Sequence, residues 1–116
     1  MSEATEIAKK FKCLSVEARV RIVQLLKGRS LCVNALAARL NMTQGAVSQH
    51  LRILRDAGLV VPEKRGYWVH YRLDEPIMDA WLSMAAELLK NDKSVLPCLS
   101  SEEREETGGR AKKKDL

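Results

Sequence analysis

The stretch from residue 33 to residue 58 reads VNALAARLNMTQGAVSQHLRILRDAG, and it decides the fold. Its apolar residues recur at spacings of three and four, which predicts two short helices joined by a tight turn at Asn41-Met42-Thr43. The second helix begins after Thr43, whose hydroxyl can cap it, and ends before Gly58. The inward side chains are Val33, Leu36, Ala37 and Leu40 on the first helix, and Val47, Leu51 and Leu54 on the second.

Two further amphipathic helices precede this pair. The first begins near Glu3, and the second covers residues 16–27, with Ser15 as its expected N-cap and Gly28 as a left-handed stop. The apolar side chains expected to face inward are Ile7, Phe11 and Leu14 on the first, and Val16, Val20, Val23 and Leu25 on the second.

After the helical pair the apolar period changes from about 3.6 to 2. Residues 67–73 alternate along an extended run that is rich in aromatic and β-branched side chains. With Leu59-Val60-Val61 they predict a two-stranded hairpin that carries Lys64 and Arg65 at its tip. Pro62 is tolerated because such a ribbon has edges.

A fifth helix is expected after Asp74, which can cap it, with Pro76 in its first turn. Its apolar residues fall into two sets, namely Ile77, Trp81, Met84, Ala85 and Leu88, and then Met78, Leu82 and Leu89. A helix with two apolar sides at the end of a small domain needs to be covered twice. We therefore expect a two-fold partner, a second copy of the chain, to cover the fifth helix.

The chain is expected to form one domain over residues 1–99, followed by a charged tail over residues 100–116, because 116 residues leave no room for a second core. Charge is uneven along it. Residues 1–72 hold 13 basic and 5 acidic side chains, residues 73–100 hold 2 and 5, and the tail holds 5 of each. A basic region of this size favours an anionic partner, and nucleic acid is the first candidate.

Composition excludes several classes of protein. The N-terminus is polar and acidic where a signal peptide would be basic and then apolar, and no run of about 18 apolar residues occurs. Three widely spaced cysteines do not make a secreted disulfide framework. We therefore expect a cytoplasmic protein without a membrane segment. There is no glycine-rich phosphate loop and no nucleophile with a matching base, so an enzyme is not expected.

Two helices with a tight turn, followed by a hairpin, form a winged helix-turn-helix, so the expected fold is mainly α with about five helices and a β-hairpin wing. Such a fold places its second helix in the major groove of DNA. The predicted DNA-contacting residues are Thr43, Gln44, Gly45, Ser48, Gln49, Arg52, Lys64 and Arg65, with Arg55 further along the same face. Two alternatives stay open, an ordinary solvated helix surface and a winged-helix module that binds an acidic protein.

Several motifs in this order resemble the ArsR/SmtB family of winged-helix repressors over roughly residues 5–90. They are Phe11-Lys12-Cys13-Leu14-Ser15, Ala18-Arg19-Val20-Arg21-Ile22, Val47-Ser48-Gln49-His50-Leu51, Leu54-Arg55-Asp56-Ala57-Gly58-Leu59-Val60 and Tyr71-Arg72-Leu73. The resemblance implies a homodimer built on the first and fifth helices. It would bind double-stranded operator DNA, and a metal, metalloid or redox signal would release it. The family's Cys-x-Cys sensor pattern is incomplete here, since Cys32-Val33-Asn34 stands in its place, and the fifth helix lacks the histidines of the zinc sensors.

The cysteines are the expected route for such a signal. Cys32, Cys98 and Cys13 together are the smallest set that could supply three sulfurs to As(III) or another thiophilic ion from one chain. Cys32 and Cys98 could instead form a disulfide, and all three could be packing residues. His50 is expected to be a hydrogen-bonded structural histidine, and His70 a surface residue.

Overall fold

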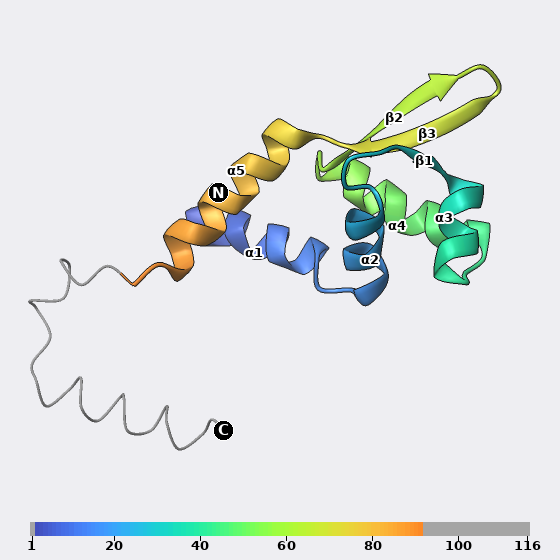
Figure 1. The fold of residues 1–116 in the computed structure, drawn as a ribbon. Helices are drawn as coiled ribbons and strands as arrows, with labels where there is room; N and C mark the ends of the chain where they lie inside the picture. Colours follow the sequence, from blue (N-terminus) through green and yellow to red (C-terminus); the bar gives the residue numbers. More distant parts are fainter. Residues whose placement is uncertain (1, 92–116) are drawn as a thin grey trace, which may run out of the picture.

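The computed structural model describes residues 2–91, and the predicted domain boundary after residue 99, the tail and Cys98 lie outside them. The elements follow the chain in the order α1 (Glu3–Cys13), α2 (Glu17–Leu25), β1 (Leu31–Cys32), α3 (Val33–Leu40), α4 (Gln44–Asp56), β2 (Val60–Arg65), β3 (Trp68–Leu73) and α5 (Glu75–Leu89). Figure 1 shows α2, α3 and α4 gathered at one end of the molecule, the β2–β3 hairpin projecting from them, and α1 beside α5 at the other end.

The core lies between α2, α3 and α4, and the hairpin closes it. Its fully buried side chains are Ile22, Leu26, Leu36, Val47, Leu51, Leu54 and Val60. The inward faces predicted for α3 and α4 are therefore confirmed. The stripe predicted for α2 is wrong at Val20, which is exposed, because the alternative apolar spacing of Ile22 and Leu26 is the one that faces the core.

Most helices begin and end at the capping residues that the sequence predicted. Oγ1 of Thr43 accepts a hydrogen bond from the Ala46 amide at 3.1 Å, and Oδ1 of Asp74 accepts one from the Ile77 amide at 3.2 Å. Gly58 lies at φ +84°, as a residue that stops a helix should. The predicted cap at Ser15 is wrong, because its hydroxyl donates backward to the Lys12 carbonyl and Val16 takes the N-cap position without a side-chain bond.

The predicted hairpin is present and belongs to a three-stranded antiparallel sheet in the order β1-β3-β2. Strand β1 has only two residues, too few for a period-2 pattern to reveal, and it pairs Cys32 with His70. Strand β2 forms an edge, which is where Pro62 can be accommodated. The last pair of the hairpin joins Arg65 to Trp68, so Gly66 and Tyr67 form the turn. Lys64 and Arg65 therefore end β2 rather than form the tip.

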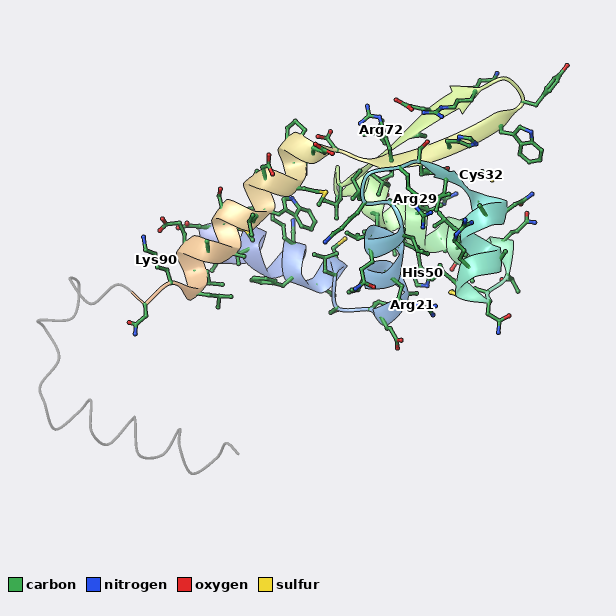
Figure 2. All side chains as sticks on the ribbon, in the orientation of Figure 1. Arg21, Arg29, Cys32, His50, Arg72 and Lys90 are labelled. Carbon is green, nitrogen blue, oxygen red and sulfur yellow. The ribbon has the colours of Figure 1, made fainter. Side chains whose placement is uncertain are left out.

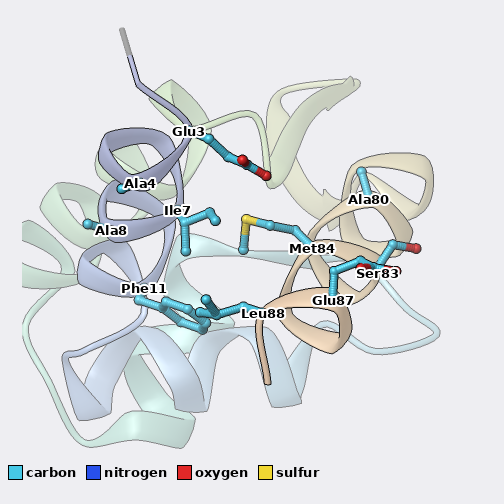
Figure 3. A pocket seen from close by; sticks show the side chains of 10 residues that line it. All are labelled: Glu3, Ala4, Ile7, Ala8, Phe11, Ala80, Ser83, Met84, Glu87 and Leu88. Atoms are coloured by element: carbon cyan, nitrogen blue, oxygen red, sulfur yellow. The ribbon is translucent and has the colours of Figure 1, made fainter. Parts of the chain in front are cut away.

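The terminal helix pair, α1 and α5, packs together at the edge of the core, to which it contributes Cys13 and Trp81. Trp81 of α5 is buried, and Lys10 of α1 lies 6.0 Å from the centre of its indole ring. Beside this contact the two helices enclose an open groove of about 930 Å³ with an apolar floor. Figure 3 shows Ile7 and Met84 facing each other across that groove.

Much of the apolar surface of the terminal helix pair is uncovered in the single chain. Leu82 is 68% exposed and Leu89 73% exposed, and Leu88 and Phe11 are exposed as well. The second apolar side predicted for α5 thus exists and lies in water, apart from Met78, which packs against the core. No helix within residues 2–91 is long and apolar enough to cross a membrane.

Candidate nucleic-acid interface

The outer face of α4 is a polar surface that lies opposite the core. Because Val47, Leu51 and Leu54 are buried, the side chains on the other side of the helix point into solvent. These residues, which we call the recognition face, are Thr43, Gln44, Gly45, Ser48, Gln49, Arg52 and Arg55, and all of them are exposed. The structure thus places the α4 members of the predicted contact set on one surface.

The recognition face is electrostatically prepared for an anion. No acidic residue lies in the first turn of α4, so the positive end of its helix dipole is not offset by a carboxylate. The Thr43 hydroxyl already accepts the Ala46 amide, and its proton is left to donate outward. Arg52 and Arg55 add two positive charges on later turns of the same face. Phosphate groups would be attracted to the start of the helix and to these arginines, while Asp56 at its end is the acid of α4.

Gly45 has no role in the fold of the chain that we can identify. A Cβ built at this position would meet no heavy atom within 4 Å, and its backbone does not have a positive φ. Glycine near the start of a helix is therefore not required by packing or by backbone geometry. It does allow another molecule to approach the backbone closely.

Tyr71 extends the recognition face onto the sheet, and the prediction from sequence missed it. Together with Ser48, Leu51, Arg52 and Arg55 it lines a small hollow of about 130 Å³ between α4 and β3. The available signal was the alternation of β3, because Tyr71 shares a strand face with Leu73, which is buried.

The wing carries an ion-pair network at its edge. Glu63 accepts hydrogen bonds from Nε of Arg72 at 2.7 Å and from a terminal nitrogen of Arg65 at 3.2 Å, and these two guanidinium groups hold its pKa below the usual range. The charge of Arg65 is therefore partly matched within the wing. Lys64 is exposed and forms no ion pair with any described residue, so it is the wing cation best able to meet a phosphate.

His50 and Arg19 connect α4 to the helix before it. Nε of Arg19 donates to Nδ1 of His50 at 3.3 Å, and another nitrogen of the same guanidinium donates to the Cys13 carbonyl at 3.2 Å. Burial, and then the charge of Arg19, lower the pKa of His50, so the ring is a neutral acceptor. This confirms the structural histidine expected from sequence, which Figure 2 labels beside α4.

The cysteines differ in their surroundings. Cys13 is buried in the core, and this burial raises the pKa of its thiol, an effect that the charge of Arg19 only partly opposes. A protonated core thiol is a poor ligand and a poor nucleophile. Cys32 is half-buried at the N-cap of α3, where Figure 2 shows it at the junction of sheet and helix.

The described residues alone do not make the three-thiol site that a trigonal soft ion needs. Cys32 is the one partly accessible thiol among residues 2–91, and no three His, Cys, Asp or Glu side chains gather there around a possible metal position. His70, expected on the surface, is half-buried opposite Cys32, and its Nδ1 is shielded without a hydrogen-bond partner among the described residues. Its pairing partner could not be read from sequence, because strand β1 was not recognisable.

A helical pair with an exposed second helix, a third supporting helix and a β-hairpin define this protein as a winged helix-turn-helix. Comparison with known sequences gives the same result, since residues 17–61 match the family described as bacterial regulatory proteins, arsR family. The transcriptional repressor SmtB homolog of Synechocystis is 34% identical over 93 residues, which are 79% of this chain and 70% of that protein. The chain belongs to the ArsR/SmtB family, a family of regulatory proteins and not of enzymes.

Two further proteins are similar to the chain. The arsenical resistance operon repressor of Escherichia coli K12 is 46% identical over 72 residues. This match covers 61% of the present chain and 61% of the repressor, so it spans about six-tenths of that protein's length. Among solved structures, reduced HlyU from Vibrio cholerae superimposes with a TM-score of 0.62 at 31% identity, over 76% of this chain and 93% of HlyU.

Proposed function

We propose that this chain is a cytoplasmic, dimeric regulator that represses transcription by binding a specific operator. The observation that carries the proposal is the recognition face of α4, which has no carboxylate in its first turn and is continuous with the wing. A helix of this width fits the major groove of B-DNA, which is about 12 Å across. Gln44 and Gln49 can bond to adenine in a bidentate way, while Arg52 can reach guanine or a phosphate.

The dimer is part of the same proposal. Leu82, Leu88 and Leu89 lie in water in the single chain, and the groove between α1 and α5 is apolar beside them. A second copy placed on the terminal helix pair would remove this surface from water and would hold two recognition faces at a fixed separation. Such a dimer reads two half-sites about one helical turn, or 34–36 Å, apart.

We also propose that a thiol-reactive signal releases the operator, with Cys32 as the accessible thiol among the described residues. The name of the Escherichia coli relative supports an arsenical, and a soft metal ion or an oxidant would use the same chemistry. Cys32 occupies the N-cap position of α3 without a side-chain capping bond. Because α3 packs against α4, a bond formed at the Cys32 sulfur would shift the recognition face. Cys98 is the second thiol of this proposal.

The experiment that tests DNA reading is selection of duplexes from a random library, followed by band shifts with Gly45→Ala. We expect an enriched palindrome that the parent binds as a dimer. Gly45→Ala should keep or raise the free energy of unfolding, by up to about 1 kcal/mol, because a Cβ is tolerated there. It should weaken the selected duplex by roughly tenfold, since the backbone can no longer approach as closely. A protein that enriches no sequence would be an adaptor and not an operator reader.

The proposed release of DNA by a thiol-reactive signal is tested with the variants Cys32→Ser and Cys13→Ser. Arsenite, cadmium or peroxide should displace the reduced parent and Cys13→Ser from the selected duplex, and should fail to displace Cys32→Ser. Cys13→Ser is the control because its thiol is buried in the core. Equal release of Cys32→Ser would show that the signal does not act through this thiol.

A further inference from the structure

Arg19 joins three helices through one guanidinium group. It belongs to α2, and it donates to Nδ1 of His50 on α4 at 3.3 Å and to the carbonyl of Cys13 at the end of α1 at 3.2 Å. That carbonyl lies in the last turn of α1, where backbone acceptors have no partner within the helix. The two donating nitrogens belong to one rigid plane, so the end of α1 and the ring of His50 are held at a fixed relative position.

The two partners of Arg19 are neutral groups. Arg19 is half-buried and forms no ion pair with any described residue. Its charge lies close to both partners, since it opposes the rise that burial causes in the pKa of Cys13 and adds to the lowering that burial causes in the pKa of His50. A guanidinium that is paired with a carbonyl and an imidazole, and with no acid, contributes geometry to the fold and does not neutralise a charge.

The helices that Arg19 connects have separate tasks in the proposed function. Helix α1 belongs to the terminal helix pair, on which a second copy would bind, and α4 carries the recognition face. The terminal helix pair also contributes Cys13 and Trp81 to the core, but apolar contacts favour burial without fixing an angle. Hydrogen bonds are directional, and His50 directly follows Gln49 of the recognition face. The bonds of Arg19 therefore fix the direction of the recognition face relative to α1.

We propose that Arg19 is a positioning residue that acts through His50 and sets the angle between the two recognition faces of the dimer. The inference rests on the proposed function and deepens it. The recognition face contacts the bases of one half-site, while Arg19 determines which spacing of two half-sites the dimer accepts. One extra base pair between the half-sites moves the second one by about 3.4 Å and turns it by about 34°. A dimer whose recognition faces are held at a fixed angle should reject such a duplex.

The test compares three duplexes, namely the selected palindrome, the same palindrome with one base pair inserted between its half-sites, and a duplex with a single half-site. Arg19→Met keeps an unbranched side chain and removes both hydrogen bonds. Its affinity for the palindrome should fall on the order of tenfold, and its affinity for the single half-site by less than about twofold, because only simultaneous binding of two half-sites depends on the angle. Its preference for the original spacing should shrink accordingly. Arg21→Met, at an exposed arginine of α2 that Figure 2 labels, removes the same charge and should bind all three duplexes like the parent.

Variants of His50 test the same hydrogen bond from its other end, and they keep the inference testable if Arg19→Met does not fold. His50→Asn retains an oxygen that can accept from Nε of Arg19, so it should keep the spacing preference of the parent. His50→Ala has no acceptor and should lose that preference. Combining His50→Ala with Arg19→Met should cost no more than Arg19→Met alone, since both changes remove one interaction. Equal behaviour of His50→Asn and His50→Ala would overturn the inference.

The single half-site provides the readout that a merely structural role would not leave unchanged. If Arg19 only stabilised the fold, Arg19→Met would lose affinity equally on all three duplexes, and that result would overturn the inference, as would a parental preference for spacing in this variant. Analytical ultracentrifugation should show a dimer for every variant, and a monomeric Arg19→Met would instead assign Arg19 to the dimer contact. If the parent itself enriches no duplex, it is the proposed function that fails.

Discussion

The reading unit, which comprises α2, α3, α4 and the wing, and the terminal helix pair differ in how completely one chain covers their apolar surface. In the reading unit, Val47, Leu51 and Leu54 of α4 are almost fully buried. In α5, by contrast, only Trp81 is buried, while Leu82 and Leu89 are mostly exposed. A single chain can therefore build the surface that we propose for DNA, and the surface that joins two such units needs a second chain.

The difference separates folding from assembly. Changes inside the reading unit should act on the stability of the chain, since its contacts are internal. Changes on the exposed side of α5 should act on dimerisation, because those side chains have no partner within the described residues.

Leu54→Ala should have the largest effect on stability. It removes a side chain that is fully buried, and such truncations cost about 2–5 kcal/mol. Leu89→Ala is the matched control, since its side chain is 73% exposed and should contribute little to the fold of a single chain. Urea unfolding at a concentration where the protein is monomeric measures both variants. Equal losses would mean that the side chain of Leu89 is covered within the single chain.

The double variant Leu82→Glu with Leu89→Glu should split the dimer. Burying two carboxylates in an apolar contact is strongly unfavourable, while both positions tolerate charge in the single chain because they are exposed. Affinity for the palindrome should fall at least about hundredfold, since the half-sites are then bound independently. Analytical ultracentrifugation and band shifts measure the two effects. A folded monomer with parental operator affinity would contradict the role assigned to the terminal helix pair.

Thr43→Ala should destabilise the chain by about 1 kcal/mol, since it removes the side-chain acceptor for the Ala46 amide at the start of α4. Thr43→Ser keeps the hydroxyl and should restore most of the loss. Both are measured by thermal or urea unfolding. The DNA affinity of Thr43→Ala should fall by more than the loss of stability explains, because the same hydroxyl also faces the proposed DNA. Full stability in Thr43→Ala would show that the cap is not used in solution.

The smallest effect is expected from pH at His50. Burial and the Arg19 charge lower the pKa of His50 from 6.5, so the unfolded chain takes up this proton more readily than the folded chain. The stabilising contribution is complete above about pH 6.5 and is lost as the pH falls toward the lower folded-state pKa. Unfolding measured at about pH 7.5 and about pH 5.5 should show a smaller decrease in His50→Asn, which cannot titrate. An identical decrease in both proteins would show that His50 does not cause the pH dependence of stability.

Sequence patterns predicted the fold well where local and tertiary preferences agree. The apolar spacing of residues 33–58 gave both helices, because the residues that favour a helix there are also the ones that the core needs. The α4 part of the recognition face followed from the same spacing, since a buried stripe fixes the opposite face. Asp74 and Thr43 capped the helices that they were expected to cap.

The rest depended on contacts that a linear pattern does not contain. Strand β1 is too short to show alternation and exists because β3 pairs with it, so the partner of Cys32 and the burial of His70 were both missed. Two apolar spacings overlap in α2, and only packing selects the one through Ile22 and Leu26. The tip of the wing lies at Gly66 and Tyr67 and not at Lys64 and Arg65 as predicted. The positive φ of Gly66, not the position of the basic residues, sets the turn.

The measurement that tests the central claim most directly is the salt dependence of binding to the selected palindrome. If each subunit neutralises three or four phosphates, the dimer makes about six to eight phosphate contacts. A plot of log K against log salt concentration should then be linear with a slope of roughly −5 to −7, and Lys64→Ala should reduce its magnitude by about one for each lysine that meets a phosphate. A slope near zero, or the same slope and affinity on unrelated duplexes, would contradict the account of a dimer that reads DNA through α4 and the wing.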